Sequence, residues 1–437
     1  MSDAPRPKDI QKRAVMVDGG SGVWLPALTN EYAYVLTACH NLRVNRDTPE
    51  ILRAPEEIVI TFHDGSTCSA IQIVPSVICD AAVLLVPRID VDPVAVSPAV
   101  RMRDPVWLVG YPDTRRDDGL DPTRVYRGEV ESFDEFEIDI STASFAHVDE
   151  VRGASGAGLY KLVDDKWVLI GIEYGMESRP AEGHNWLRCS PIPVFEQLLR
   201  ENALAPMLPP FLLSFDGLVS AAFPLPGLEC ARTHGLLQKI LHHVACAKLG
   251  VNCPAPHEVL EKFGEQLLVF GEPRYNLTDK KLWISWLELL VLSALLDQPA
   301  RIDGAYMDGL RKRRRLLYSG SSREWTDFIE HILCSNFEGL DADGLVLVSN
   351  NRESPPIKTS PIRDLSKIIP DIALPLDSAL DIGISRKPAM PRKLMHLDGL
   401  HMDCIVRRED EYAAELGQDF STTLNLLIEA YRAAFAQ

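Results

Sequence analysis

Three polar residues, far apart in the chain, have surroundings that could turn a serine into a nucleophile. Ser155 lies in the glycine-rich stretch 152–158, His40 ends a β-rich run, and Asp80 begins an apolar one. A serine hydroxyl attacks a carbonyl carbon only when a base accepts its proton, and a histidine serves best when a carboxylate holds its ring. The order His, Asp, Ser along the chain therefore predicts covalent catalysis by a serine hydroxyl.

Two neighbouring residues offer alternative assignments. Asp64 is a rival carboxylate, but Asp64-Gly65 stands between two alternating segments and is typical of a hairpin turn. Cys39 precedes His40 directly and suggests a thiolate nucleophile. Successive side chains of an extended segment point to opposite faces, so Cys39 is not expected to share a site with His40.

The sequences around these positions resemble those of the trypsin-like (chymotrypsin-fold) serine peptidases. Residues 37–40 read Thr-Ala-Cys-His where the family has Thr-Ala-Ala-His, and residues 80–84 read Asp-Ala-Ala-Val-Leu where it has Asp-Ile-Ala-Leu-Leu. Residues 153–157 read Gly-Ala-Ser-Gly-Ala where the family has Gly-Asp-Ser-Gly-Gly. The resemblance covers residues 10–200 and implies a catalytic triad of His40, Asp80 and Ser155.

The resemblance also implies roles for four further residues. The backbone N–H groups of Gly153 and Ser155 would form the oxyanion hole. Tyr174 and Gly175 end a strand that pairs with the substrate backbone in the family, and Asp149 stands where a carboxylate selects lysine or arginine. These assignments predict a protein or peptide substrate, cleaved after basic residues.

The chain departs from the family at several positions near this site, and Ala157-Gly158 replaces Gly-Pro directly after the serine turn. Ala154 replaces the aspartate that receives a freed N-terminus during zymogen activation, so that switch cannot operate here in the same way. Glu173 stands where the family often has a serine close to the buried aspartate, which leaves the hydrogen bonding around Asp80 open.

The distribution of apolar residues changes at about residue 200. Before it, two sets of about six short alternating segments predict two small antiparallel barrels. After it, apolar residues recur at helical spacing, with two strand-like segments. We therefore predict a multidomain chain: an all-β double antiparallel barrel (chymotrypsin-like) followed by a mostly helical α+β domain. The boundaries are 1–200 for the peptidase domain, 201–230 for a proline-rich linker and 231–437 for an interaction domain.

Composition and the absence of certain segments indicate the cellular compartment of the protein. Its nine cysteines, an odd number among 437 residues, show no disulfide-framework spacing, and residues 1–13 lack the apolar segment of a signal peptide. The apolar run 282–296 contains Glu288 and is too short to span a bilayer. A formal net charge of −17 disfavours direct binding to nucleic acid or to an anionic membrane. These features predict a reduced, cytoplasmic protein without a membrane segment.

Three features of the second half could bind something. His242, Cys246, Cys253 and His257 have a spacing open to zinc, although ordinary helix and loop residues explain it better, so no metal or cofactor is expected. The basic run 311–315 could contact an acidic partner or nucleic acid, although a solvated helix face paired with local carboxylates is commoner. The exposed remainder of an apolar stripe would offer a docking surface; the stripe comprises Trp283, Trp286, Leu287, Leu289 and Leu290.

Residues 276–288 and 313–319 are similar to the C-terminal modules of effectors in bacterial ABC-three-component (Lamassu-like) antiviral systems. That resemblance implies protein partners, an SMC-like ATPase and a smaller subunit. Together, the two halves predict an intracellular serine endopeptidase that is the protease effector of a defence complex, gated by partners docked on its C-terminal domain. The alternative is a catalytically silent peptide-binding adaptor or a structural subunit of an ATPase complex.

Overall fold

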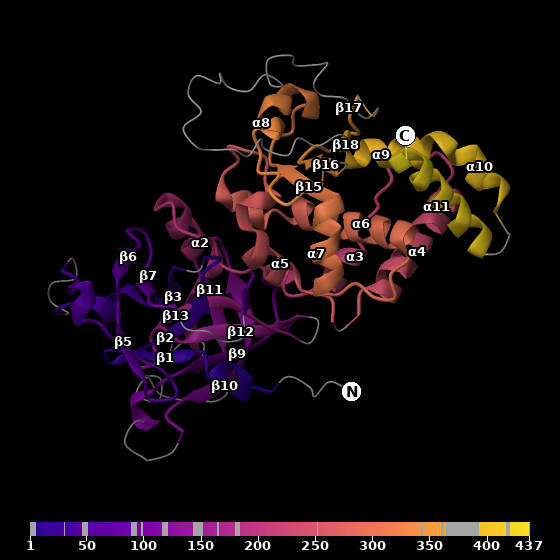
Figure 1. The fold of residues 1–437 in the computed structure, drawn as a ribbon. Helices are drawn as coiled ribbons and strands as arrows, with labels where there is room; N and C mark the ends of the chain where they lie inside the picture. The colour runs from indigo at the N-terminus through magenta and orange to yellow at the C-terminus, as the bar shows by residue number, and fades with distance from the viewer. Residues whose placement is uncertain are drawn as a thin grey trace, which may run out of the picture. The chain divides into compact units, whose positions relative to one another are not determined.

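The chain forms two compact units, Met1–Pro210 and Phe211–Gln437. In the computed structural model the first is built mainly of strands and the second mainly of helices (Figure 1), which confirms the predicted fold class. The structure describes residues 6–436 except 30, 46–50, 89–93, 98, 116–120, 143–151, 164–165, 180–183, 251, 342–343, 358, 360–361, 364–392 and 417–419.

The first sheet of the N-terminal unit has seven antiparallel strands. Their order across the sheet is β5 (Thr67–Ser69), β4 (Val59–Thr61), β1 (Ala14–Val17), β2 (Gly20–Pro26), β3 (Ala33–Thr37), β7 (Ala82–Val86) and β6 (Gln72–Pro75). Strand β7 is buried on both faces. Val83 and Leu85 enter one hydrophobic cluster, and the alternate residues Ala82, Leu84 and Val86 enter another. An uninterrupted apolar run therefore forms a strand here because each side of the sheet has its own core.

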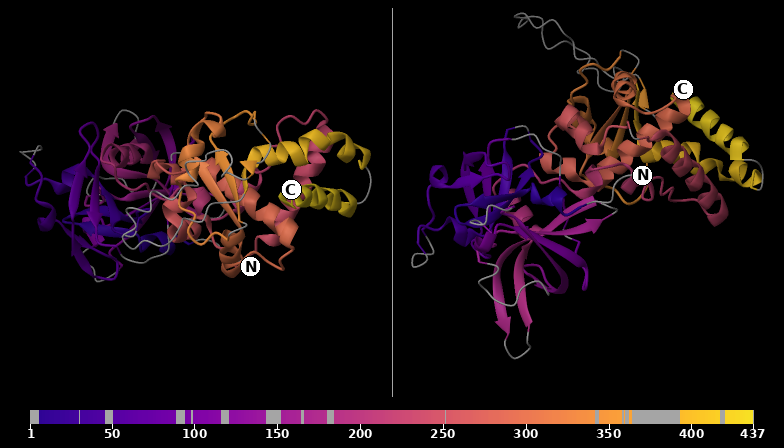
Figure 2. Two further views of the ribbon diagram at one scale, coloured as in Figure 1. Left: turned by 45° about the horizontal axis from the view of Figure 1, so that its top comes forward. Right: turned by 90° about the horizontal axis from the view of Figure 1, so that it is seen from below.

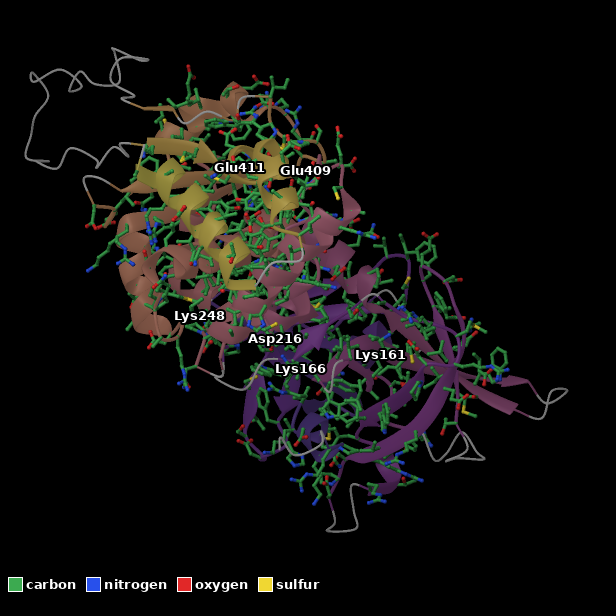
Figure 3. All side chains as sticks on the ribbon, turned by 90° about the vertical axis from the view of Figure 1, so that its right-hand side faces the viewer. Lys161, Lys166, Asp216, Lys248, Glu409 and Glu411 are labelled. Atoms are coloured by element: carbon green, nitrogen blue, oxygen red, sulfur yellow. The ribbon has the colours of Figure 1, made fainter. Side chains whose placement is uncertain are left out.

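The second sheet also has seven strands and closes on itself. Its order is β12 (Gly158–Val163), β9 (Pro105–Gly110), β10 (Arg124–Phe133), β11 (Ile138–Ser141), β14 (His184–Pro191), β13 (Lys166–Arg179) and β8 (Ala95–Val96). Closure comes from an additional pairing between β12 and β13. Lys161 of β12, labelled in Figure 3, lies 2.8 Å from Asp104. Both sheets fit a chymotrypsin-like fold, and Figure 2 shows them from two further sides.

The predicted linker contributes to both units. After helix α2 (Ile192–Glu201), the carbonyl of Ala205 accepts a hydrogen bond from the hydroxyl of Tyr34, and the carbonyl of Pro206 accepts one from the N–H of Leu28. Residues 204–208 therefore pack on the first unit. Farther along, the N–H of Phe223 bonds to the buried carboxylate of Glu288 inside the second unit.

Helices surround a small sheet in the second unit. Strands β15 (Arg314–Ser319), β16 (Leu345–Asn350) and β18 (Lys393–His396) are parallel, and β17 (Ile362–Arg363) adds an antiparallel edge. The helices are α3 (Asp216–Val219), α4 (Ala231–Lys248), α5 (Pro256–Phe263), α6 (Lys280–Asp297), α7 (Gly304–Arg313), α8 (Ile329–Leu333), α9 (Leu397–Cys404), α10 (Glu409–Ala414) and α11 (Phe420–Ala436). Glu409 of α10, labelled in Figure 3, accepts hydrogen bonds from the N–H groups of Glu229 and Cys230, just before α4.

Helix α6 is the core of this unit and not a docking surface. The indole of Trp283 donates to the carbonyl of Leu277 inside the core. All five residues of the predicted stripe have at most 1 % of their surface exposed: Trp283, Trp286, Leu287, Leu289 and Leu290. The stripe prediction was therefore wrong, because contacts from several neighbouring elements cover every side of the helix. Within the described residues, no helix has the length and apolar character needed to cross a membrane.

The basic run 311–315 makes contacts within the unit. It is not the solvated helix face that the commoner alternative predicted, because Arg314 and Arg315 begin strand β15 and Arg315 is buried. Arg313 and Arg314 both pair with Asp297, and Arg314 does so through two hydrogen bonds of 2.8 Å. Arg311 lies over the ring of Phe263, 3.8 Å from its centre. The guanidinium of Arg315 is buried and donates to the carbonyls of Asn336 and Glu338, which closes the loop after α8 onto β15.

Replacing Arg315 with methionine should destabilise the second unit strongly. It leaves two carbonyls without their charged donor, and breaking such a buried bond costs about 1–3 kcal/mol per unsatisfied group. Lys312→Met is the matched control, because this side chain of the same run is exposed and should change stability by less than about 0.5 kcal/mol. Thermal unfolding of the two full-length variants measures the difference, and equal melting temperatures would contradict the structural role of Arg315.

Candidate active site

His40 and Asp80 come together because their strands are neighbours. His40 lies in a short 3-10 helix, Cys39–Leu42, that begins two positions after the end of β3. Asp80 lies two positions before the start of β7. Strands β3 and β7 pair antiparallel, with Thr37 opposite Ala82, so the end of one adjoins the start of the other. The Nδ1 atom of His40 lies 2.6 Å from Oδ2 of Asp80, and the backbone N–H of His40 donates to Oδ1 at 2.8 Å.

This two-point contact fixes the ionisation of Asp80. Burial by itself would raise the pKa of Asp80, but the hydrogen bonds and charge of His40, with a smaller contribution from Arg43, hold the pKa below its ordinary value. The carboxylate therefore stays ionised at neutral pH. A carboxylate on Nδ1 orients the ring and leaves Nε2 to exchange a proton.

The alternative residues lie elsewhere. Asp64 accepts hydrogen bonds from the N–H and hydroxyl of Ser66 in the turn that joins β4 to β5, and these bonds lower its pKa. Cys39 has 8 % of its surface exposed and packs in the core cluster of Val35 and Leu42. Burial, then the negative charge of Asp80, raises the pKa of the Cys39 thiol, which is therefore neutral.

Ser21 on β2 ties the Ser155 loop to the first sheet. Its N–H donates to the carbonyl of Ser155 at 2.7 Å, and its hydroxyl donates to the carbonyl of Gly153 at 2.9 Å. The same hydroxyl accepts from the N–H of Tyr111, just after β9 of the second sheet, at 2.8 Å. Ser21 thus holds both sides of the loop that carries the candidate nucleophile.

Asn41 brings this loop next to His40. Its side-chain amide donates to the carbonyl of Ser155 at 2.7 Å and to the hydroxyl of Thr37 at 3.0 Å. The residue after the histidine and the backbone of the serine are therefore joined by one hydrogen bond. Neither Ser21 nor Asn41 was identified from the sequence. The two glycines of Gly20-Ser21-Gly22 could have indicated that another segment packs closely against Ser21.

The Ser155 loop depends on two glycines. Gly153 and Gly156 have φ angles of 82° and 96°, a backbone conformation that favours glycine. A Cβ atom on Gly156 would lie 1.7 Å from the carbonyl oxygen of Ser21. The N–H of Ser155 donates to no acceptor in the part of the chain that the structure describes.

Glu173 lies beneath this loop on β13. Its backbone N–H donates to the carbonyl of Ala157 at 2.8 Å, and its carbonyl accepts from the N–H of Gly156 at 2.7 Å. The side chain has 3 % of its surface exposed. Burial, and then the negative charge of Asp80, raises the pKa of Glu173 to about 8, so its carboxyl is protonated at neutral pH.

The predicted substrate-binding residues have different surroundings. The hydroxyl of Tyr174 donates to Glu137, which also pairs with Arg188 at 2.9 Å, so Tyr174 is part of a local polar cluster. At Gly175 a Cβ atom would meet nothing within 4 Å, which leaves open space beside β13. Asp149 lies outside the described residues, and its role stays a prediction.

The structure also shows where the residues of the zinc alternative lie. Nε2 of His242 lies 2.9 Å from the carbonyl of Ala222, and Nδ1 of His257 lies 3.0 Å from the carbonyl of Leu212. These ring nitrogens bond to backbone oxygens. Among the described residues, no group of three or more metal-binding side chains comes together.

Comparison with protein families gives a match over the C-terminal half. Residues 189–406 match the model of C-terminal domain 4 of the ABC-three component (ABC-3C) systems. The match confirms the predicted resemblance of the C-terminal half and is consistent with a protein that works with protein partners. Comparison with curated proteins gave no match.

Gly156→Ala should destabilise the first unit much more than Gly65→Ala. Both glycines have a positive φ, which costs an alanine about 1–2 kcal/mol. A Cβ atom on Gly65 meets open space, whereas one on Gly156 collides with Ser21, and such overpacking costs about 1–3 kcal/mol more. Thermal unfolding of the full-length variants compares the two; equal losses would show that the loop does not need this close approach.

Proposed function

We propose that this protein is a serine endopeptidase with a triad of Ser155, His40 and Asp80. The observation that carries the proposal is the two-point contact between His40 and Asp80, next to a serine loop that Asn41 ties to the same segment. The local structure of each residue supports its proposed role. Asp80 is an ionised carboxylate on Nδ1, His40 follows a rigid buried strand, and Ser155 stands in a tight glycine turn.

In the proposed mechanism, the hydroxyl of Ser155 attacks the peptide carbonyl while His40 accepts its proton at Nε2. Asp80 holds the imidazole in the required tautomer and stabilises the imidazolium that forms. The developing oxyanion accepts hydrogen bonds from the N–H groups of Gly153 and Ser155. His40 then returns the proton to the leaving amine, and water releases the acyl group by the same steps in reverse.

The family match extends the proposal to a complex. The matched C-terminal domain is described as a component of three-component systems, and this supports a protease effector of a bacterial defence complex. We propose that the second unit joins the peptidase to partner subunits, an SMC-like ATPase and a smaller protein, in the cytoplasm. Cleavage after lysine or arginine, through Asp149, belongs to the same proposal.

Ser155→Ala should abolish labelling by a fluorophosphonate probe and cleavage of a protein substrate. Loss of a nucleophile in such a triad lowers turnover by about six orders of magnitude. Ser66→Ala is the matched control, since this serine of the same unit lies in an exposed turn and its hydroxyl donates to the neighbouring Asp64. Labelling of the alanine variant at the wild-type rate would refute the triad. Absence of wild-type labelling even when the partner subunits are present would favour the adaptor.

The full-length chain alone should be latent or weakly active. Ala154 lacks the carboxylate of the zymogen switch, so partners on the second unit are the remaining control. Binding of the partner subunits, obtained as the complex that copurifies with this chain, should raise the rate of probe labelling by about 5- to 150-fold, the usual range of an allosteric coupling. The test compares labelling rates of the purified chain with and without the complex. An equal, fast rate in both samples would contradict gating.

A further inference from the structure

We propose that Glu173 is a positioning residue whose proton keeps the Ser155 loop and Asp80 in their active arrangement. When Glu173 loses that proton, the arrangement is lost and activity falls on the alkaline side. This inference rests on the proposed function, and it adds a control that the triad itself does not contain.

The backbone of Glu173 supports the serine loop from below. Both of its peptide groups bond to the loop, one to Gly156 and one to Ala157, at 2.7 and 2.8 Å. These two residues directly follow Ser155. A shift of Glu173 would therefore shift the turn that sets the position of the serine hydroxyl.

The side chain of Glu173 lies in surroundings that do not suit a charge. Its Oε2 atom is buried and has no hydrogen-bond partner among the described residues. The carboxyl group accepts one hydrogen bond from the N–H of Gly175, on the segment predicted to pair with substrate. A buried carboxylate needs several donors or a cation, and one N–H group does not replace the water that it has lost.

The neighbouring titratable groups oppose ionisation. Asp80 contributes a negative charge that raises the pKa of Glu173. Cys189 stands opposite Glu173 in the β13–β14 register, and burial raises the pKa of its thiol well above the ordinary value, so it is neutral. The positive charge of Arg43 acts on Asp80.

Two more carboxylates act on the neighbouring thiol. Asp139 and Glu137 act on Cys189, and Arg188 pairs with Glu137. Ionised Glu173 would therefore add a second negative charge beside Asp80 without a cation of its own. The site relieves this repulsion by moving the Glu173 side chain toward solvent, which pulls on the Ser155 loop.

The experiment is a pH profile of probe labelling from pH 6 to 10. With its partner subunits present, wild-type protein should label about tenfold more slowly at pH 9.5 than at pH 8, because the protonated fraction of Glu173 falls. Glu173→Gln keeps the size and loses the titration, so its alkaline decline should disappear. Glu196→Gln is the matched control, because burial also raises the pKa of this α2 carboxyl, yet it should keep the wild-type profile.

A second measurement separates this inference from the proposed function. In protein labelled with ¹⁵N-histidine, the ring signals of His40 should show an extra inflection near pH 8 that Glu173→Gln lacks. Labelling without an alkaline decline, or a decline that Glu173→Gln retains, would overturn the role of Glu173 and leave the peptidase standing. If wild-type protein is not labelled at any pH even with its partner subunits present, the proposed function fails. Ring signals of His40 without the inflection then overturn the inference as well.

Discussion

The candidate site depends on the hydrogen bonds of one residue, Ser21. Its N–H and hydroxyl bind the two ends of the Ser155 turn, while the same hydroxyl accepts from Tyr111 of the second sheet. Its carbonyl accepts from the hydroxyl of Thr37, at the end of the strand that leads to His40. Four polar contacts of one buried serine thus join strand β2, the histidine segment and the serine loop.

This arrangement explains why small residues surround the site. Backbone-to-backbone contact between the loop and β2 leaves no room for side chains at Gly156, or at Gly110, where a Cβ atom would lie 2.6 Å from Ala157. Ala154 and Ala157 are fully buried in the core of the second sheet. The small residues let the Ser155 loop approach β2 closely, and this close approach allows the backbone hydrogen bonds to form.

Much of this site could be predicted from local sequence, and the reasons are physical. His40 and Asp80 flank two apolar strands, and antiparallel pairing of those strands suffices to join them. The surroundings of Ser155 follow from its glycines. Ser21 and Asn41 could not be found in this way, because their partners are backbone carbonyls, and a sequence does not show which loop will meet which strand.

The same limit applies to the polar residues of the second unit. The basic run suggested an exposed surface. In the structure, Asp297 pairs with Arg313 and Arg314. Asp297 ends helix α6, whereas Arg313 ends the next helix, α7, and Arg314 begins strand β15. The stripe of α6 suggested an amphipathic helix with one free side. Periodicity identifies the apolar residues of a helix but not the number of neighbours that will cover it.

Helix α6 resembles the Ser155 region in one respect, because a single buried polar group organises apolar surroundings. Glu288 accepts the N–H of Phe223 at 2.6 Å and lies 3.4 Å from Nε2 of His401, whose Nδ1 meets the hydroxyl of Tyr431 at 2.8 Å. These contacts join α6, α9, α11 and the segment before α4. Apolar packing alone tolerates several arrangements of such helices, whereas each of these hydrogen bonds is satisfied in only one. A movement of α9 or α11 relative to α6 would therefore break these hydrogen bonds.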